Sequence, residues 1–447
     1  MKIFYSFSFL LLFLISFKSH SQNYNIQNLD LRTTIDIALE NNLNLQRSQV
    51  NLANQEANLI GNQGQRIPTL STGASTGYRW GRSINPVTNL FENNRIGNIN
   101  VFGNSNMTLF AGQQITNSIK QSRTDIEAAR YNVKATENTI TLNVINLFIN
   151  VVFAKEQLKI AENQLATTKE QLSVTTKLVD AGALPLANKL DIQAQNATNE
   201  LEVINASNNL RIAKLNLAQA MQIPFDNRLD VIAPDLDPEN YMLTQREVDE
   251  IFEIALELMP EVKAAELGIE SAEFGVKIAR GGYMPTLGIG ASAFSNYVDQ
   301  FFMGERLDFG TQMRNNFSNS ANMQLNIPIL SNLRNRANVQ RARLQKRLSE
   351  IQESETKNQL RQDIESAYTN AYASRQSYQA SQIRVSSLEE AFRIAQQRFD
   401  AGAINFADYQ LAQNNYFNAQ ADLVTSKYTY IFRVKVLDFY LGNPLKL

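Results

Sequence analysis

The sequence carries one long pattern twice, and this repeat limits the possible folds more than any other feature. The stretch "RIPTLSTGAS" at residues 66–75 returns as "YMPTLGIGAS" at 283–292. Further along, "DAGALP" at 180–185 returns as "DAGAIN" at 400–405. A period of this size is too long for a solenoid repeat, so we expect a tandem duplication of one large unit.

Two similar halves joined by a connector are therefore expected. The first half covers 22–225, a connector rich in Pro and Asp covers 226–244, and the second half covers 245–447. Each half should run in the order helix, strand hairpin, long helix, short helix, with the hairpins at 68–110 and 285–330. The connector is expected at the equator, because two short helices placed end to end match one long helix in length.

The hydrophobic pattern of each half predicts long helices packed as coiled coils. Apolar and small residues recur in steps of four and three from Ile140 to Val179, and again from Ile364 to Phe399. Such heptads are typical of coiled-coil seams, whereas a single amphipathic helix on an ordinary core would not need so many steps. At 1.5 Å per residue, each long helix would measure about 98 Å. We expect long helices at 115–179 and 333–399 and short helices at 33–64 and 186–221.

The prolines of the repeated phrase mark a change from helix to strand. After Pro68 and Pro285 the apolar residues recur at every second position, with small polar residues on the other face. Each half thus supplies two strands of about 10 to 13 residues, which can cross a bilayer when tilted. Four strands cannot close a barrel, and open edges in lipid leave backbone groups unpaired, so an oligomer is required.

The expected fold is mainly α with a β-barrel portion. We predict a long coiled-coil α-helical barrel continuous with a 12-stranded transmembrane β-barrel, formed by a trimer with four strands per chain. Tyr78 and Trp80 end the first strand, where an aromatic girdle would lie at the membrane surface. Strand ends also carry Tyr and Trp for packing reasons, and this alternative stays open.

The first residues and the lack of cysteine exclude several kinds of site. Residues 1–21 have the features of a secretory signal peptide, so the mature chain is expected to begin near Gln22. The only histidine, His20, lies in that segment, and the chain has no cysteine. A His/Cys zinc site, a Ser-His-Asp triad, a Cys nucleophile and a lipid anchor on cysteine are therefore all excluded.

Neither catalysis nor nucleic-acid binding is indicated. The stretch "GASTG" at 73–77 fits the G-x-S-x-G pattern of a nucleophile elbow, but its serine has no histidine to activate it. Basic and acidic residues number 42 and 43, so the chain has no basic excess for nucleic acid. We expect no enzymatic activity, no cofactor, no metal and no nucleic-acid partner.

The order of these motifs resembles the TolC family of outer-membrane channel-tunnels over nearly the whole mature sequence. The resemblance rests on the duplicated halves, the Pro-Thr-Leu entry into each hairpin, the exit at Leu109 to Gly112, and the glycine turns between long and short helices. It implies a homotrimer in the outer membrane that extends into the periplasm. There it would serve as the exit duct of an efflux or type I secretion system, working with a periplasmic adaptor and an inner-membrane transporter of the RND, ABC or MFS type.

The resemblance also implies adaptor contacts at the two glycine turns. The family has its periplasmic tips at these positions, and small residues would let a partner helix approach closely. Alternatively, each glycine only ends a helix in a left-handed cap. The candidate contact residues are Ala181, Gly182, Ala183, Ala401, Gly402 and Ala403.

The family's gate residues carry over only in part. Asp408 matches the first aspartate of the family's lumenal ring, but the second falls on Leu411. The Arg and Asp of the family's closing link fall on Ile404 and Asn188, and its tyrosine falls on Phe399. A latch here would be more apolar than the family's. Asp408 also follows Asn405 by three residues and could act only as an acid in a helix cap, so its place in the lumen stays open.

A surface trimeric coiled coil, structural or adhesive and without a lumen, is the alternative function. It would explain the heptads but not the duplicated strand hairpins. The transported substrate is left open, because specificity in such systems is a property of the pump.

Overall fold

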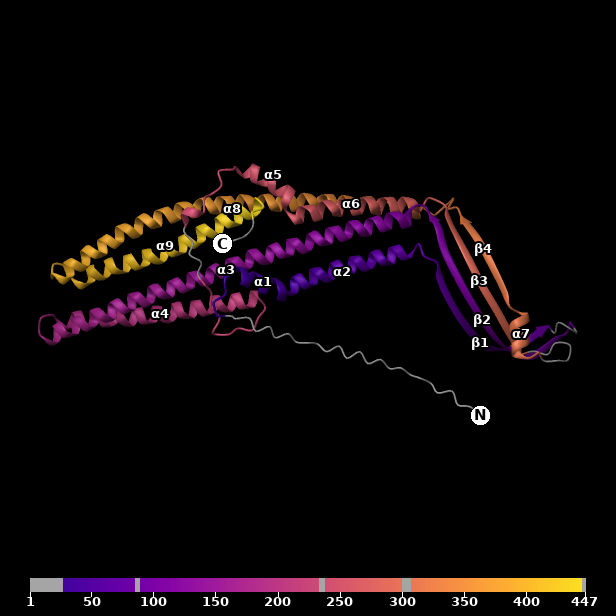
Figure 1. Cartoon of the computed structure of the whole chain (residues 1–447), viewed down its shortest axis with the longest axis horizontal. Helices are drawn as coiled ribbons and strands as arrows, with labels where there is room; N and C mark the ends of the chain where they lie inside the picture. Colours follow the sequence, from indigo (N-terminus) through magenta and orange to yellow (C-terminus); the bar gives the residue numbers. More distant parts are fainter. Residues whose placement is uncertain (1–26, 85–88, 233–237, 300–306, 444–447) are drawn as a thin grey trace, which may run out of the picture.

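The computed structural model describes residues 27–84, 89–232, 238–299 and 307–443. The predicted signal peptide at 1–21 lies outside these described residues. The described chain forms an elongated layer of helices with a sheet at one end (Figure 1). We call this end the strand end and the opposite end, where the long helices turn back, the hairpin end.

Each half contains two strands, one long helix and several shorter helices. The first half comprises α1 (Leu31–Asn41), α2 (Leu43–Gly64), β1 (Thr69–Ile84), β2 (Phe91–Ala111), α3 (Gln114–Asp180) and α4 (Leu186–Ala220). A 3₁₀ turn, η1 (Pro238–Asn240), follows in the connector. The second half comprises α5 (Val248–Leu258), α6 (Pro260–Gly281), β3 (Thr286–Asp299), α7 (Phe309–Asn315), β4 (Ser318–Asn326), α8 (Arg334–Asp400) and α9 (Phe406–Tyr440).

The two long helices are confirmed to within a residue at each end, but the first short helix is not continuous. Asn42 separates α1 from α2, and its side chain accepts hydrogen bonds from the backbone N–H groups of Asn44 and Leu45. This N-cap satisfies donors that a continuous helix would have used internally. In the second half, Pro260 occupies the first turn of α6 and separates it from α5. The prediction of one helix at 33–64 was therefore wrong.

The second strand hairpin also differs from expectation. The segment between its strands contains a short helix, α7, which begins after Asp308 and which the sequence pattern did not predict. Two oxygens of Asp308 accept from the Thr311 backbone N–H and hydroxyl. The strands are less uniform than the predicted 10 to 13 residues, since β2 has 21 residues and β4 has 9.

The four strands form one antiparallel sheet in the order β1-β2-β3-β4. Its register separates two faces, as the alternation predicted. The apolar face carries Leu70, Val101, Ile289 and Met323, all more than a third exposed. The polar face is lined mainly by Ser, Asn and Gly, with Phe102 opposite Phe294 as an exception. Within the described chain β1 and β4 are edge strands, so the sheet is open on both sides.

The long helices form the frame of the helical layer. Near the strand end the neighbours follow the order α2, α3, α6, α8, and near the hairpin end they follow α4, α3, α9, α8. The long helices α3 and α8 thus lie beside α2 and α6 near the strand end and beside α4 and α9 near the hairpin end (Figure 1). The α3–α4 and α8–α9 pairs form two helical hairpins.

The largest apolar core lies at mid-length, where the short helices begin and end. Val144 and Phe148 of α3 are fully buried there against Ile37 of α1 and Leu217 of α4. A second cluster joins α5 and α8 through Ile251 and Ile364. Among the described helices, α3 alone contains an 18-residue window with the hydropathy and low charge of a membrane span, and 44% of that window is buried. The apolar stretch of α3 packs in this core.

Candidate functional site

The two turns at the hairpin end are built alike. Gly182 and Gly402 adopt left-handed backbone angles, with φ of 72° and 70°. The Gly182 and Ala183 N–H groups donate to the Val179 and Leu178 carbonyls at 2.9 and 2.8 Å, and the second turn repeats this pattern. These bonds satisfy carbonyls that the helix end leaves free, so the capping role of both glycines is confirmed.

The small residues of both turns also face outward. All six predicted contact residues are exposed, and a Cβ added to either glycine would meet nothing within 4 Å. Both turns lie at the same end of the molecule (Figure 1). Their contact with an adaptor stays a prediction.

Two of the predicted gate residues lie in one apolar cluster that joins the helical hairpins. Phe399 and Ile404 pack with Ile192 of α4 and with Tyr409 of α9, which is fully buried. The rings of Phe399 and Tyr409 are stacked with centroids 4.9 Å apart. We call this set the end cluster; its members are Leu172, Ile192, Phe392, Phe399, Ile404, Phe406 and Tyr409.

The other three predicted gate residues lie outside the end cluster. Asn188 is half-buried in the first turn of α4, and Leu411 is 62% exposed. Asp408 is exposed in the first turn of α9, and its backbone N–H donates to the Asn405 side chain at 2.9 Å. This bond establishes Asn405 as the N-cap and puts an acid near the positive end of the helix. Whether Asp408 also lines a lumen stays a prediction.

Sequence reasoning missed the polar contacts that join the two helical hairpins. Three glutamines of α3 donate side-chain hydrogen bonds to α9, and one glutamine of α9 donates to α4. We call these the cross-hairpin bonds. They run from Gln157 to the Ala421 carbonyl at 3.3 Å, from Gln164 to Asn414 at 3.1 Å, from Gln171 to the Tyr409 hydroxyl, and from Gln410 to Gln195.

One signal in the sequence could have revealed these contacts. Gln157, Gln164 and Gln171 are spaced by one heptad each, so they form a polar stripe on one face of α3. Their partners could not be read from the sequence, because they depend on how α9 lies against α3. A polar residue that recurs every seven positions along a helix therefore indicates a contact with another helix, even where the neighbouring heptad positions are apolar.

The contacts between the helical hairpins are uncharged. Burial raises the pKa of Tyr409 to about 12; the hydrogen bond from Gln171 opposes this effect and the nearby charge of Asp400 adds to it. Tyr409 therefore stays protonated at physiological pH. The ion pairs near the hairpin end stay within one hairpin: Lys169 with Glu200, Lys189 with Asp180, and Arg384 with Asp422. Within the described residues, no ion pair joins α3–α4 to α8–α9.

At the strand end, the predicted girdle residues lie on the apolar face. Tyr78 and Trp80 are 56% and 71% exposed, with ring centroids 6.0 Å apart. A second aromatic pair, Tyr297 of β3 and Phe309 of α7, lies on the same face with centroids 5.4 Å apart. Sequence reasoning missed this pair because Phe309 is brought there by α7, which was not predicted. The role of Tyr78 and Trp80 as a girdle stays a prediction.

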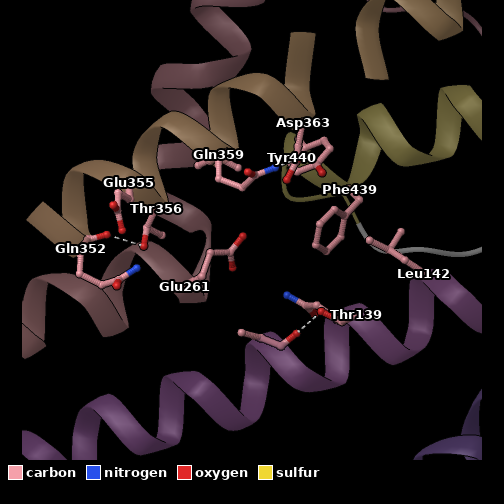
Figure 2. A pocket seen from close by; sticks show the side chains of 13 residues that line it. Thr139, Leu142, Glu261, Gln352, Glu355, Thr356, Gln359, Asp363, Phe439 and Tyr440 are labelled. Carbon is pink, nitrogen blue, oxygen red and sulfur yellow. Dashed lines mark hydrogen bonds between the residues drawn. The ribbon is translucent and has the colours of Figure 1, made fainter. Parts of the chain in front are cut away.

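A pocket of about 640 Å³ lies at mid-length, where α6 begins and α9 ends between α3 and α8. Glu261 points into this pocket, with Phe439 and Tyr440 beside it (Figure 2). Burial raises the pKa of Glu261, and the charge of Asp363 adds to this effect. Burial also raises the pKa of Tyr440 to about 12. Within the described residues, no group of three or more His, Cys, Asp or Glu side chains is arranged to hold a metal.

Comparisons with known proteins agree on the fold. The family model described as outer membrane efflux protein matches residues 34–221 and 251–443. Comparison with the sequences of curated proteins gave no match.

Several solved structures have the same architecture. CusC, described as forming a transmembrane channel, has a TM-score of 0.78 at 17% identity, covering 93% of this chain and 92% of its own. The outer membrane protein VceC of Vibrio cholerae has a TM-score of 0.75 at 18% identity, covering 93% and 97%. The CmeC outer membrane channel of Campylobacter jejuni has a TM-score of 0.75 at 19% identity, covering 92% and 85%. These likenesses confirm the predicted fold, a helical barrel continuous with a β-barrel.

Proposed function

The chain belongs to the outer membrane efflux protein family, and from this premise we propose that its hairpin end is the gated entrance of an exit duct. Family membership makes the protein an outer-membrane exit duct for efflux systems that extends into the periplasm. The family and the fold are those of a channel. The duplicated strand hairpins fit this role and have no place in the alternative, a surface coiled coil without a lumen.

The family forms trimers and works with efflux pumps and adaptors. The open sheet of one chain gives a physical reason for the trimer. Strands β1 and β4 are both edges, and an unpaired edge in lipid costs several kcal/mol for each unsatisfied backbone group. When β4 of one chain pairs with β1 of the next, three chains close a barrel with 12 strands and no edge remains.

The adaptor contact is proposed at the six tip residues, from Ala181 to Ala183 and from Ala401 to Ala403. Their exposure and small size support this, because a partner helix can approach the backbone closely there. We propose a passive conduit in which an inner-membrane transporter of the RND, ABC or MFS type supplies energy and selects the cargo. The same duct would also suit type I secretion.

The gate is proposed to be held shut by uncharged contacts within each chain. Opening requires the α8–α9 hairpin to move away from α3–α4, which breaks the cross-hairpin bonds and exposes the end cluster. The single observation that carries this proposal is Tyr409, fully buried in the end cluster and hydrogen-bonded to Gln171 across the two hairpins. The Arg–Asp link implied by the resemblance is replaced here by Ile404 and Asn188.

Bulky substitutions at the tips test the proposed entrance. Ala181 and Ala401 have φ of −82°, which any residue adopts, so Ala181→Trp and Ala401→Trp add bulk without backbone strain. We expect a several-fold rise in the accumulation of an efflux dye in cells that depend on the double variant, because the adaptor can no longer approach. The trimer should still form in detergent.

The matched control is the double variant Ala181→Ser, Ala401→Ser. Serine adds a single oxygen atom at the same two positions, so this variant should export the dye almost normally. Normal export by the double tryptophan variant would contradict the proposed contact.

A further inference from the structure

A basic and aromatic patch lies at the tip of the β1–β2 hairpin, at the end of the sheet where α7 lies and away from the long helices (Figure 1). The register pairs Trp80 with Arg95 and Arg82 with Asn93, so these residues share the apolar face with Leu70. We call this set the rim patch; its members are Tyr78, Trp80, Arg82, Phe91 and Arg95.

Both guanidinium groups of the rim patch lie over aromatic rings. The Arg82 Cζ atom is 4.3 Å from the centroid of the Phe91 ring, and the Arg95 Cζ atom is 4.8 Å from that of Tyr78. Stacking uses the flat face of a guanidinium and leaves the N–H donors along its edge available. The rim patch therefore presents two oriented sets of donors on an otherwise apolar surface.

The rim patch carries a net positive charge. Its five members include two arginines and no acid. Asp299 of β3 lies on the same face opposite Gly97, where it and the Tyr78 ring border the same space, so it lies at the edge of the rim patch. One acid beside two arginines still leaves the net charge positive. Glu92 is paired with Ser83 on the polar face.

The height of the apolar face sets the level of the rim patch in the membrane. Ten residue steps separate Leu70 from Trp80, which is about 33 Å along a strand and about 25 Å along the membrane normal at a tilt near 40°. This matches the apolar band of outer-membrane barrels, about 25 Å tall. Arg95 therefore lies at the outer edge of that band and Arg82 lies just beyond it, at the level of the outer headgroups.

We propose that the rim patch binds the phosphate group of an anionic lipid in the outer leaflet. This inference rests on the outer-membrane function stated above. Guanidinium groups bind phosphate through paired N–H donors, and the rings beside them would contact the apolar part of the same lipid. An arginine near the membrane interface costs only about 0 to 1 kcal/mol, whereas phosphate contacts add to binding. Three symmetric patches would fix the depth of the trimer in the membrane.

Native mass spectrometry of the purified trimer tests this proposal. The probes are diphosphorylated lipid A and a neutral glycolipid, each added to the delipidated trimer in mild detergent. We expect the double variant Arg82→Gln, Arg95→Gln to bind diphosphorylated lipid A about tenfold more weakly than the unmodified protein, because two charged hydrogen-bonding groups are lost. Binding of the neutral glycolipid should not change.

The matched control is Arg79→Gln, which removes an arginine from the polar face of the same strand, opposite Ile96. It should bind diphosphorylated lipid A as the unmodified protein does. Equal binding by the double glutamine variant, or an equal loss in Arg79→Gln, would overturn the proposal. Displacement of the lipid by millimolar inorganic phosphate would overturn it too, since the site would then be one for a free anion.

A second variant covers the case in which the glutamine substitutions prevent assembly. Arg82→Lys, Arg95→Lys keeps the charges but loses the planar fork that stacks on a ring. We expect a several-fold weaker binding of diphosphorylated lipid A with normal trimer assembly and unchanged channel conductance. Full binding by the lysine variant would contradict the stacked geometry, whereas loss of conductance would point instead to a failure of the duct itself.

Discussion

At the residue scale, Glu261 shows how burial can outweigh a favourable local position. It lies in the first turn of α6, where the helix dipole favours a negative charge. Burial nevertheless raises its pKa, and Asp363 raises it further. An acid whose pKa is higher in the folded protein than in the unfolded chain lowers stability once it ionises. This cost is absent below the unfolded pKa of about 4.3 and grows as pH rises through the folded pKa.

We expect Glu261→Gln to raise the thermal midpoint of the trimer at pH 8, by about 2 °C or less for a chain of this size. At pH 4 most of the gain should disappear, because the carboxyl group is then mainly protonated in both states. Thermal unfolding of the detergent-solubilised trimer at the two pH values measures the difference. The same gain at both pH values would mean that packing, not charge, is responsible.

Asp408→Asn tests the lumenal position of a residue that also lies in a helix cap. If the three copies of Asp408 line the entrance, their removal should raise the Mg²⁺ concentration for half-block of the current several-fold, since a ring of carboxylates attracts divalent cations. The Asn405 cap is retained, so helix stability should change by less than about 1 kcal/mol. The Mg²⁺ block of the channel current, measured in planar bilayers, tests whether Asp408 lines the entrance. If the half-block concentration is unchanged, helix capping is the only role of Asp408.

At the element scale, helix length was predictable and helix interruption was not. The heptad seams from Ile140 and from Ile364 cover the C-terminal parts of α3 and α8, and the predicted bounds of both helices agree with the structure to within a residue at each end. The break at Asn42 depends on one side chain that caps α2, and the apolar period continues across it. Helix α7 has only seven residues, and Gln312 ties it to the backbone N–H and carbonyl of Val298. Such a short helix depends on a tertiary contact that no local pattern records.

The residues of the candidate site were also predictable from the sequence only in part. The glycine turns were recognisable because a left-handed cap needs a particular residue type. Phe399 and Ile404 were named as gate residues and lie in the end cluster, but Tyr409 was missed. Its importance arises from stacking on Phe399 within its own hairpin and from the hydrogen bond with Gln171 of α3. The second contact depends on how the two helical hairpins lie against each other.

Tyr409→Phe should weaken the closed gate without disturbing its packing. The ring stays, while Gln171 loses its partner in a buried position, at a cost of about 1 to 2 kcal/mol per chain. Because a cost near 1.4 kcal/mol is a factor of ten, we expect the open form of each chain to be about tenfold more populated. Single-channel recording in planar bilayers gives this population.

Tyr416→Phe is the control for this variant. The Tyr416 hydroxyl lies 3.4 Å from Glu389, so that hydrogen bond stays within the α8–α9 hairpin. Its removal should leave gating unchanged. Equal opening in both variants would show that the hydrogen bonds across the hairpins do not hold the gate.

At the scale of the whole molecule, the trimer combines a closed sheet with the proposed gate, whose contacts within each chain are uncharged. The edges at β1 and β4 require neighbours, and the cross-hairpin bonds are proposed to hold each chain in a closed form. Neither feature depends on charge. The response of the assembly to salt and pH should therefore differ from that of a duct closed by ion pairs.

We expect the open population to stay constant between 0.1 and 1 M salt, although the Debye length falls from about 10 to 3 Å over this range. It should also stay constant from pH 5 to 8, because the pKa of Tyr409 is about 12. The channel conductance, divided by the conductivity of the bulk solution, measures the open population in the salt series and in the pH series. A rise in opening of several-fold at high salt would show that charges between chains, not the contacts within them, hold the gate.

The cross-hairpin bonds also show how far the two copies of the ancestral unit have diverged. The first copy contributes the heptad-spaced glutamines, and the second contributes most of the rings around Tyr409. The copies have become complementary and can no longer replace each other. A protein assembled from two first copies would keep the backbone acceptor of Gln157 but would lack Asn414 and Tyr409, the side chains that accept from Gln164 and Gln171.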